Sequence, residues 1–182
     1  MKRILILTLL LTGLISCGPQ AKNQTIQVQD TTPAGNGIYY WKTVFALNEY
    51  ETEFLKKHGI TKLYIRLFDV ALQSQSTQDT LELIPIGSTQ FKSKVPENLE
   101  VIPTVYITYE SLRHIDKMSY KDCESYVDRI LKRIEAMSSY HELPDVKEVQ
   151  FDCDWTESTF WTYHHICEYA KKKLNDKGLK FS

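Results

Sequence analysis

Two aspartates that alternate with apolar residues are the clearest sign of chemistry in this chain. Asp152 and Asp154 lie on one face of an extended strand together with Gln150. The opposite face carries the apolar set Val149, Phe151, Cys153 and Trp155. Carboxylates two residues apart on a strand lie about 7 Å from each other, so they repel and one pKa can rise. The pair predicts catalytic acid–base or electrostatic action on a sugar or another polar substrate.

Further polar or aromatic side chains lie on the expected strands or at their ends. We expect these residues to bind substrate beside the aspartates; they are Lys42, Arg66, Asp69, Tyr106 and Trp155. The alternative is structural, because Lys42 and Arg66 could instead neutralise the two aspartates in an internal ion network.

The sequence carries no signature of a metal site or a cofactor site. His164 and His165 are adjacent on an expected helix, so they point about 100° apart and cannot bind one ion together. We therefore predict no metal and no cofactor. Cys123, Cys153 and Cys167 are expected to be buried free thiols, with a Cys153–Cys167 disulfide as the alternative.

Strand and helix patterns alternate along the chain. Aromatic and β-branched runs predict strands at 38–46, 62–70, 100–108, 148–155 and 179–182. Helices are expected over Glu49–His58 behind the Asn48 cap with Glu51, after Ser119 with Asp122, and from Thr156 or Glu157. The polar stretch Gln73–Lys94 is expected to be an elaborated loop. The alternation predicts a parallel sheet built from βαβ units.

This order of elements predicts an α/β fold of the TIM type. In such a barrel the polar face of the 148–155 strand points inward, near the carboxyl-end mouth where active sites lie. A complete (β/α)₈ barrel needs about 250 residues, whereas this chain has 182. We therefore expect the N-terminal four to five βα units of a barrel that is truncated at its C-terminus, with the missing half as a partner. A net charge of −1 and the absence of a basic stripe argue against a nucleic-acid partner.

The N-terminus has the three parts of an export signal. Lys2 and Arg3 precede the apolar run Ile4–Ile15, which is too short to span a membrane. Leu14-Ile15-Ser16-Cys17 resembles the bacterial lipobox. The resemblance implies cleavage before Cys17 and its acylation, which would anchor the chain to a membrane. We expect a signal peptide at 1–16, a flexible tether at 17–37 and the folded domain at 38–182. Gly18, in place of the Asp that would retain the chain at the inner membrane, favours the outer membrane of the cell envelope.

The strand with the aspartates resembles a known family. Phe151–Trp155 is similar to the fourth strand of chitinase-type (family 18) glycosidase barrels, whose pattern is D-x-x-D-x-D-x-E. Asp152 and Asp154 match the second and third Asp of that pattern. Val149 occupies the first Asp position, and Thr156 occupies the position of the general-acid Glu.

A second resemblance covers residues 38–182. The chain is similar to an uncharacterised lipoprotein group of gut anaerobes with glycosidase-like barrels. The matching runs are Tyr40–Thr43, Tyr64–Val70, Ile102–Tyr106 and Gln150–Thr156. This resemblance implies the architecture and the envelope location more than the chemistry.

Two classes of function follow from the sequence. The first is a glycoside-hydrolase-like envelope lipoprotein that processes or binds a glycan, in which this chain alone is inactive. The second is a non-catalytic lipoprotein that binds carbohydrate or protein, or is purely structural.

Overall fold

The computed structural model describes residues 35–74 and 81–182. The expected signal peptide, the lipidation site Cys17 and nearly all of the expected tether lie outside these residues. The domain begins slightly earlier than expected, because β1 starts at Asn36.

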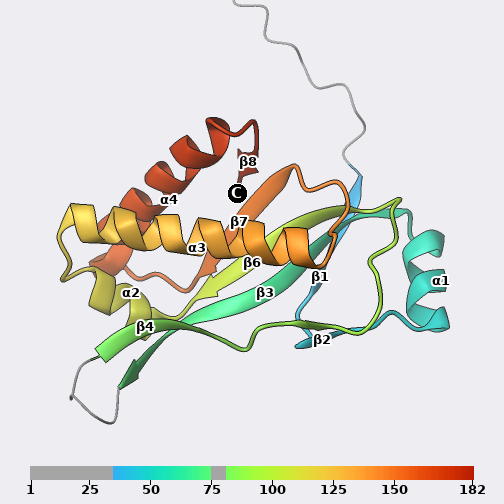
Figure 1. Cartoon of the computed structure of the whole chain (residues 1–182), viewed down its shortest axis with the longest axis horizontal. Helices are drawn as coiled ribbons and strands as arrows, with labels where there is room; N and C mark the ends of the chain where they lie inside the picture. Colours follow the sequence, from blue (N-terminus) through green and yellow to red (C-terminus); the bar gives the residue numbers. More distant parts are fainter. Residues whose placement is uncertain (1–34, 75–80) are drawn as a thin grey trace, which may run out of the picture. The chain divides into compact units, whose positions relative to one another are not determined.

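A mainly parallel sheet forms the centre of the domain (Figure 1). Five strands run parallel in the order β1-β3-β6-β7-β8, and β4 joins β3 antiparallel. Their bounds are β1 Asn36–Tyr40, β3 Ile60–Ser74, β4 Leu81–Ile86, β6 Glu100–Ile107, β7 Glu148–Cys153 and β8 Lys180–Phe181. A separate two-stranded parallel sheet pairs β2 Val44–Phe45 with β5 Gln90–Phe91. The prediction of a parallel α/β sheet is therefore confirmed.

The helices begin at polar caps. These helices are α1 Glu49–Lys57, α2 Tyr109–Ile115, α3 Tyr120–Tyr140 and α4 Phe160–Asn175, the last preceded by the 3₁₀ turn η1 Glu157–Thr159. Asn48 and Glu51 form the predicted capping box at α1, and Ser119 caps α3. Thr108 caps α2. Each cap satisfies backbone N–H groups that the first helical turn leaves without partners.

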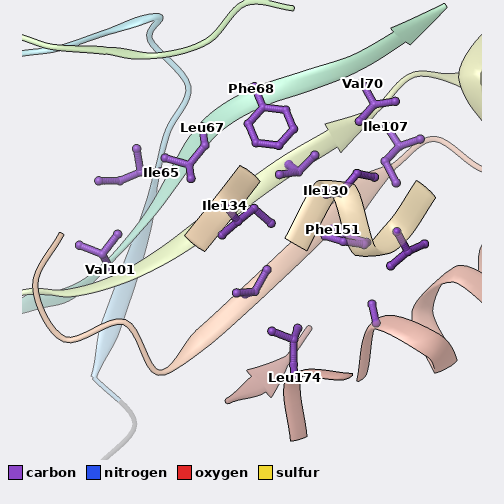
Figure 2. Packing of buried hydrophobic residues seen from close by; sticks show 14 of the residues in the cluster. Ile65, Leu67, Phe68, Val70, Val101, Ile107, Ile130, Ile134, Phe151 and Leu174 are labelled. Carbon is purple, nitrogen blue, oxygen red and sulfur yellow. The ribbon is translucent and has the colours of Figure 1, made fainter. Parts of the chain in front are cut away.

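The hydrophobic core lies between one face of the sheet and the helices. Leu63 and Ile65 of β3, Val105 of β6 and Phe151 of β7 are buried in one cluster with side chains of α3 and α4. Figure 2 shows members of this cluster from β3, β6, β7, α3 and α4 packed together. The buried apolar side chains of the described helices all belong to this cluster. On the other face of the sheet, which we term the uncovered face, Ile102 and Thr104 of β6 are fully buried, whereas Tyr39, Gln150 and Asp152 are exposed or partly exposed.

One irregularity of β3 decides which of its side chains face outward. The pairing of β3 with β6 shifts by one residue directly after Arg66. Residues three apart on a regular strand face opposite sides, yet Arg66 and Asp69 both face away from the helices. Leu67 and Phe68 both enter the core (Figure 2). The extra residue is a β-bulge, which re-aims side chains locally.

The structure corrects several expectations. The strand expected at 38–46 is broken at Trp41–Thr43 into β1 and β2. The stretch expected as a loop at 73–94 contains β4 and β5, because β3 continues to Ser74 and pairs with β4. Helix α2 was not predicted. Within the described ranges the sheet does not close into a barrel.

The core predicts a specific stability effect. Phe151 is buried on β7 and its ring lies 5.3 Å from that of Phe181. We expect Phe151→Ala to lower the free energy of unfolding by about 3–5 kcal/mol, since it removes a large buried side chain and leaves a cavity. Urea unfolding followed by circular dichroism measures this.

The matched control for that variant is Tyr140→Ala at the exposed end of α3. We expect this change to stay within about 0.5 kcal/mol of the parent. Equal losses of unfolding free energy in Phe151→Ala and Tyr140→Ala would contradict the burial of Phe151 in the core.

Candidate functional site

The alternation predicted for the strand with the aspartates is present in β7. Val149 and Phe151 are buried against the helices, whereas Gln150 and Asp152 lie on the opposite face and are partly exposed. Register places Asp152 beside Tyr106 of β6. Asp154 follows the end of β7 and is exposed. The uncovered face therefore carries Asp152 and Asp154, which we call the acid pair, at the carboxyl ends of β6 and β7.

Tyr106 contacts the acid pair directly. Its hydroxyl donates a hydrogen bond of 2.9 Å to Asp154 Oδ2. Burial, helped by this bond, raises the pKa of Tyr106 to about 12. Tyr106 is therefore a neutral hydrogen-bond donor at physiological pH, and it fixes the orientation of the Asp154 carboxylate.

Asp152 differs from Asp154 in its surroundings. Burial and then the negative charge of Asp154 raise the pKa of Asp152, while a bond from the Cys153 backbone N–H opposes the rise. A carboxyl whose proton is held more tightly is suited to donate that proton or to share it with a neighbouring oxygen.

A hydrogen-bonded amide lies in the middle of the uncovered face. Gln150 Nε2 donates to Tyr39 Oη over 2.8 Å, and Thr104 Oγ1 donates to Gln150 Oε1 over 3.3 Å. Two strands, β3 and β6, separate Tyr39 from Gln150. In a flat sheet the outer two of four strands lie about 14 Å apart and their perpendicular side chains cannot meet. The contact therefore requires the sheet to curl toward this face.

Exposed aromatic rings extend the site toward β1. The rings of Tyr39 and Trp41 stack at 5.8 Å with an interplanar angle of 13°. Tyr64 packs on Tyr39 at 4.7 Å. Tyr39 is 46% and Trp41 43% exposed, so much of their ring surface is open to a ligand. The sequence analysis did not include these rings in the site; the available signal was their spacing of two residues at the end of β1, where Tyr39 lies in the strand and Trp41 directly follows it.

Arg66 is engaged elsewhere on the same face. It forms a two-pronged ion pair with Asp69, in which Nε and Nη2 each lie 2.6 Å from a carboxylate oxygen. Only 17% and 16% of the two side chains is exposed. Gly87 lies beside this pair: a Cβ there would approach Arg66 Nη2 to 2.6 Å, and the φ of +57° at this position also favours glycine.

Lys42 and Trp155 do not lie where the sequence analysis expected. Lys42 pairs with Glu51, the acid of the α1 capping box. Because Arg66 and Lys42 bind other carboxylates, the alternative in which they neutralise the two aspartates is wrong. Trp155 turns toward α4, where its ring meets the edge of Phe160 at 5.4 Å. The structure thus brings Asp152, Asp154 and Tyr106 together and places Lys42 apart from them.

The remaining chemical candidates bind no common ion. Among residues 35–74 and 81–182, no group of three His, Cys, Asp or Glu side chains is arranged to hold a metal. Cys123, Cys153 and Cys167 are free thiols, so the alternative disulfide is not formed. His164 and His165 contact different aromatic rings, namely Trp161 and Tyr120.

Comparison with known proteins identifies no relative. No family model, curated protein or solved structure matches this chain significantly. In the described part of the chain, no helix has both the length and the apolar character needed to cross a membrane.

The raised pKa of Asp152 predicts a pH-dependent stability. The folded chain holds this proton to a higher pH than the unfolded chain does. The carboxyl's stabilising contribution is therefore complete below the ordinary Asp range and is lost as pH rises through the raised pKa. We expect Asp152→Asn to gain stability over the parent at pH 7, and this gain to vanish near pH 3. Urea unfolding at the two pH values measures it.

Glu53→Gln on the exposed side of α1 removes the same charge and is the control. It should show no such difference between the two pH values. A stability gain for Asp152→Asn that is equal at pH 3 and pH 7 would contradict the raised pKa of Asp152. Such a gain would come from changed contacts, which do not depend on the protonation of the carboxyl.

Proposed function

We propose that this chain is a cell-envelope lipoprotein whose uncovered sheet face binds a glycan. The observation that carries the proposal is the exposed, stacked pair Tyr39–Trp41 on a face that also presents Gln150 and Asp154. No other part of the described chain combines open parallel rings with fixed amide and carboxylate groups.

This combination suits the chemistry of a sugar. A pyranose ring has an apolar face of C–H groups that can lie flat on an aromatic ring, and an edge of hydroxyls that donate and accept hydrogen bonds. The Asp154 carboxylate accepts from hydroxyls, and Tyr106 holds it in place. Side chains that are already oriented lose little entropy on binding, which favours affinity.

Hydrolysis is a second candidate, supported by the acid pair. On an ideal extended strand, carboxylates two residues apart would lie about 7 Å from each other, within the roughly 6.5–9.5 Å range of inverting glycosidases. Against this, the general-acid position of the chitinase-type pattern is held by Thr156, whose hydroxyl contacts those of Ser158 and Thr159. We therefore propose binding, with no glycosidase turnover by this chain alone.

The architecture we propose is part of a (β/α)₈ barrel. The order of five parallel strands, the curl implied by the Tyr39–Gln150 bond, and an acid pair at the carboxyl ends of strands support it. The curled face would then correspond to the barrel interior.

The envelope location rests on residues 1–17 and has its own test. We expect the full chain expressed in a Gram-negative host to incorporate an alkyne-tagged palmitate, because acylation is directed to the cysteine of a lipobox. Cys17→Ser should lose the label, as detected in a gel after coupling to a fluorophore. Cys167→Ser, which removes a thiol of α4, should keep it. Label retained in Cys17→Ser would disprove the lipidation site.

Glycan binding is tested by affinity electrophoresis in gels cast with xylan, mannan, β-glucan or starch. We expect at least one polysaccharide to retard the chain. Trp41→Ala should weaken that retardation about three- to tenfold, since stacking contributes roughly 0.5–1.5 kcal/mol. Asp154→Asn should weaken it further through the lost acceptor.

Tyr140→Ala removes an exposed aromatic ring of α3, outside this face, and should migrate like the parent. If the parent chain released reducing sugar and Asp154→Asn did not, the proposal of binding would have to give way to one of hydrolysis. The absence of retardation by every polysaccharide would refute the proposal.

A further inference from the structure

A second site lies on the helical side of the domain. A pocket of about 480 Å³ opens between the turn that joins α2 to α3 and the first turns of α4. This volume is in the range of small-molecule sites. The pocket belongs to neither the acid pair nor the rings of β1, so the proposed function leaves it unexplained.

Two aromatic rings line this pocket and remain largely open. Tyr120 begins α3 and Trp161 lies in the first turn of α4, and each is 76% exposed. Tyr120 rests against His165 at 4.6 Å, which supports its ring from behind. Large apolar side chains are normally buried where packing allows, so two such rings beside one pocket indicate a surface that a ligand covers.

The polar groups of the pocket include Asp116, Thr162 and His165. Thr162 Oγ1 donates to Asp116 Oδ1, which links the end of α2 to α4, and the exposed Asp116 carboxylate can accept further hydrogen bonds. His165 Nε2 is shielded from solvent and has no hydrogen-bond partner; its nearest charged group, Glu124 Oε1, lies 3.6 Å away. A buried polar atom without a partner, such as His165 Nε2, is rare in folded proteins.

The charge of the pocket narrows the ligand class. Asp116 lines it, Glu124 lies beside it, and no Lys or Arg is among its lining residues. An anionic sugar would therefore be repelled. Flat rings together with a hydroxyl and a carboxylate acceptor match a neutral pyranose.

The pocket is also connected to the first site. The rings of Trp155, Phe160 and Trp161 follow one another at centroid distances of 5.4 and 5.0 Å. Trp155 is the neighbour of Asp154 in the chain. Exposed rings thus lead from the acid pair to the pocket, at the end of the domain where β6 and β7 terminate and α2 and α3 begin (Figure 1).

We propose that this pocket, bounded by Tyr120 and Trp161, binds a second, neutral pyranose unit of the same glycan chain. The inference rests on the proposed function for its ligand class. It adds that the ligand is an uncharged oligomer long enough to reach both sites, and that Asp116 accepts hydrogen bonds from the distal sugar.

Isothermal titration of the full chain tests this with cello-, xylo-, manno- and maltohexaose, their disaccharides, hexagalacturonate and choline. We expect at least one neutral hexaose to bind, and hexagalacturonate and choline not to bind. Trp161→Ala and Tyr120→Ala should each weaken binding of the hexaose about three- to tenfold and leave the disaccharide unchanged. Trp41→Ala should weaken the binding of both the hexaose and the disaccharide.

Controls keep the outcomes distinct. Alanine is favourable in helices, so the Tyr120 and Trp161 variants should fold, which a thermal melt verifies. Tyr140→Ala should bind both sugars like the parent. Full hexaose binding in both pocket variants, with loss in Trp41→Ala, would overturn the second site and leave the proposed function intact. A parent that binds none of the sugars would overturn both, and one that binds choline alone would overturn the sugar assignment of the pocket.

Discussion

The helices pack on one face of the parallel sheet, and this one-sided coverage determines what the other face can do. Each strand sends alternate side chains to opposite sides. Apolar residues such as Val149 and Phe151 enter the core, and their neighbours Gln150 and Asp152 must then face away from it. The core and the candidate site therefore both follow from the same alternation. A shift of register by one residue would turn the apolar side chains outward and the polar side chains into the core.

Electrostatics on the uncovered face depend on a local departure from that alternation. The bulge after Arg66 places this residue and Asp69 on the same side, where they form a nearly buried ion pair. Arg66 is thereby committed to Asp69. Asp152 and Asp154 remain close to each other, and the Tyr106 hydroxyl donates a hydrogen bond to Asp154. Their mutual repulsion adds to the effect of burial in raising the pKa of Asp152.

The sequence predicted helix caps and strand faces correctly where all the residues that define the feature lie in one short segment. The capping box of Asn48 with Glu51 and the cap at Ser119 depend on residues three apart, and both are present. The β7 alternation likewise lies within six residues. Strand β4 was not predicted, because its six residues become a strand only by pairing with the extension of β3. The short helix α2 was missed because seven residues carry too little periodicity to separate it from a loop.

The sequence by itself determined the class of fold, the caps of α1 and α3 and the side of the β7 segment that carries Asp152 and Asp154, because these follow from propensity and periodicity along one segment. Only the tertiary structure decided that Lys42 pairs with Glu51, that Arg66 pairs with Asp69, and that Tyr39 bonds to Gln150. Those partners depend on the bulge, on the break after β1 and on the curl of the sheet. Each of these arises from pairing between strands, and such pairing is absent from any single stretch of sequence.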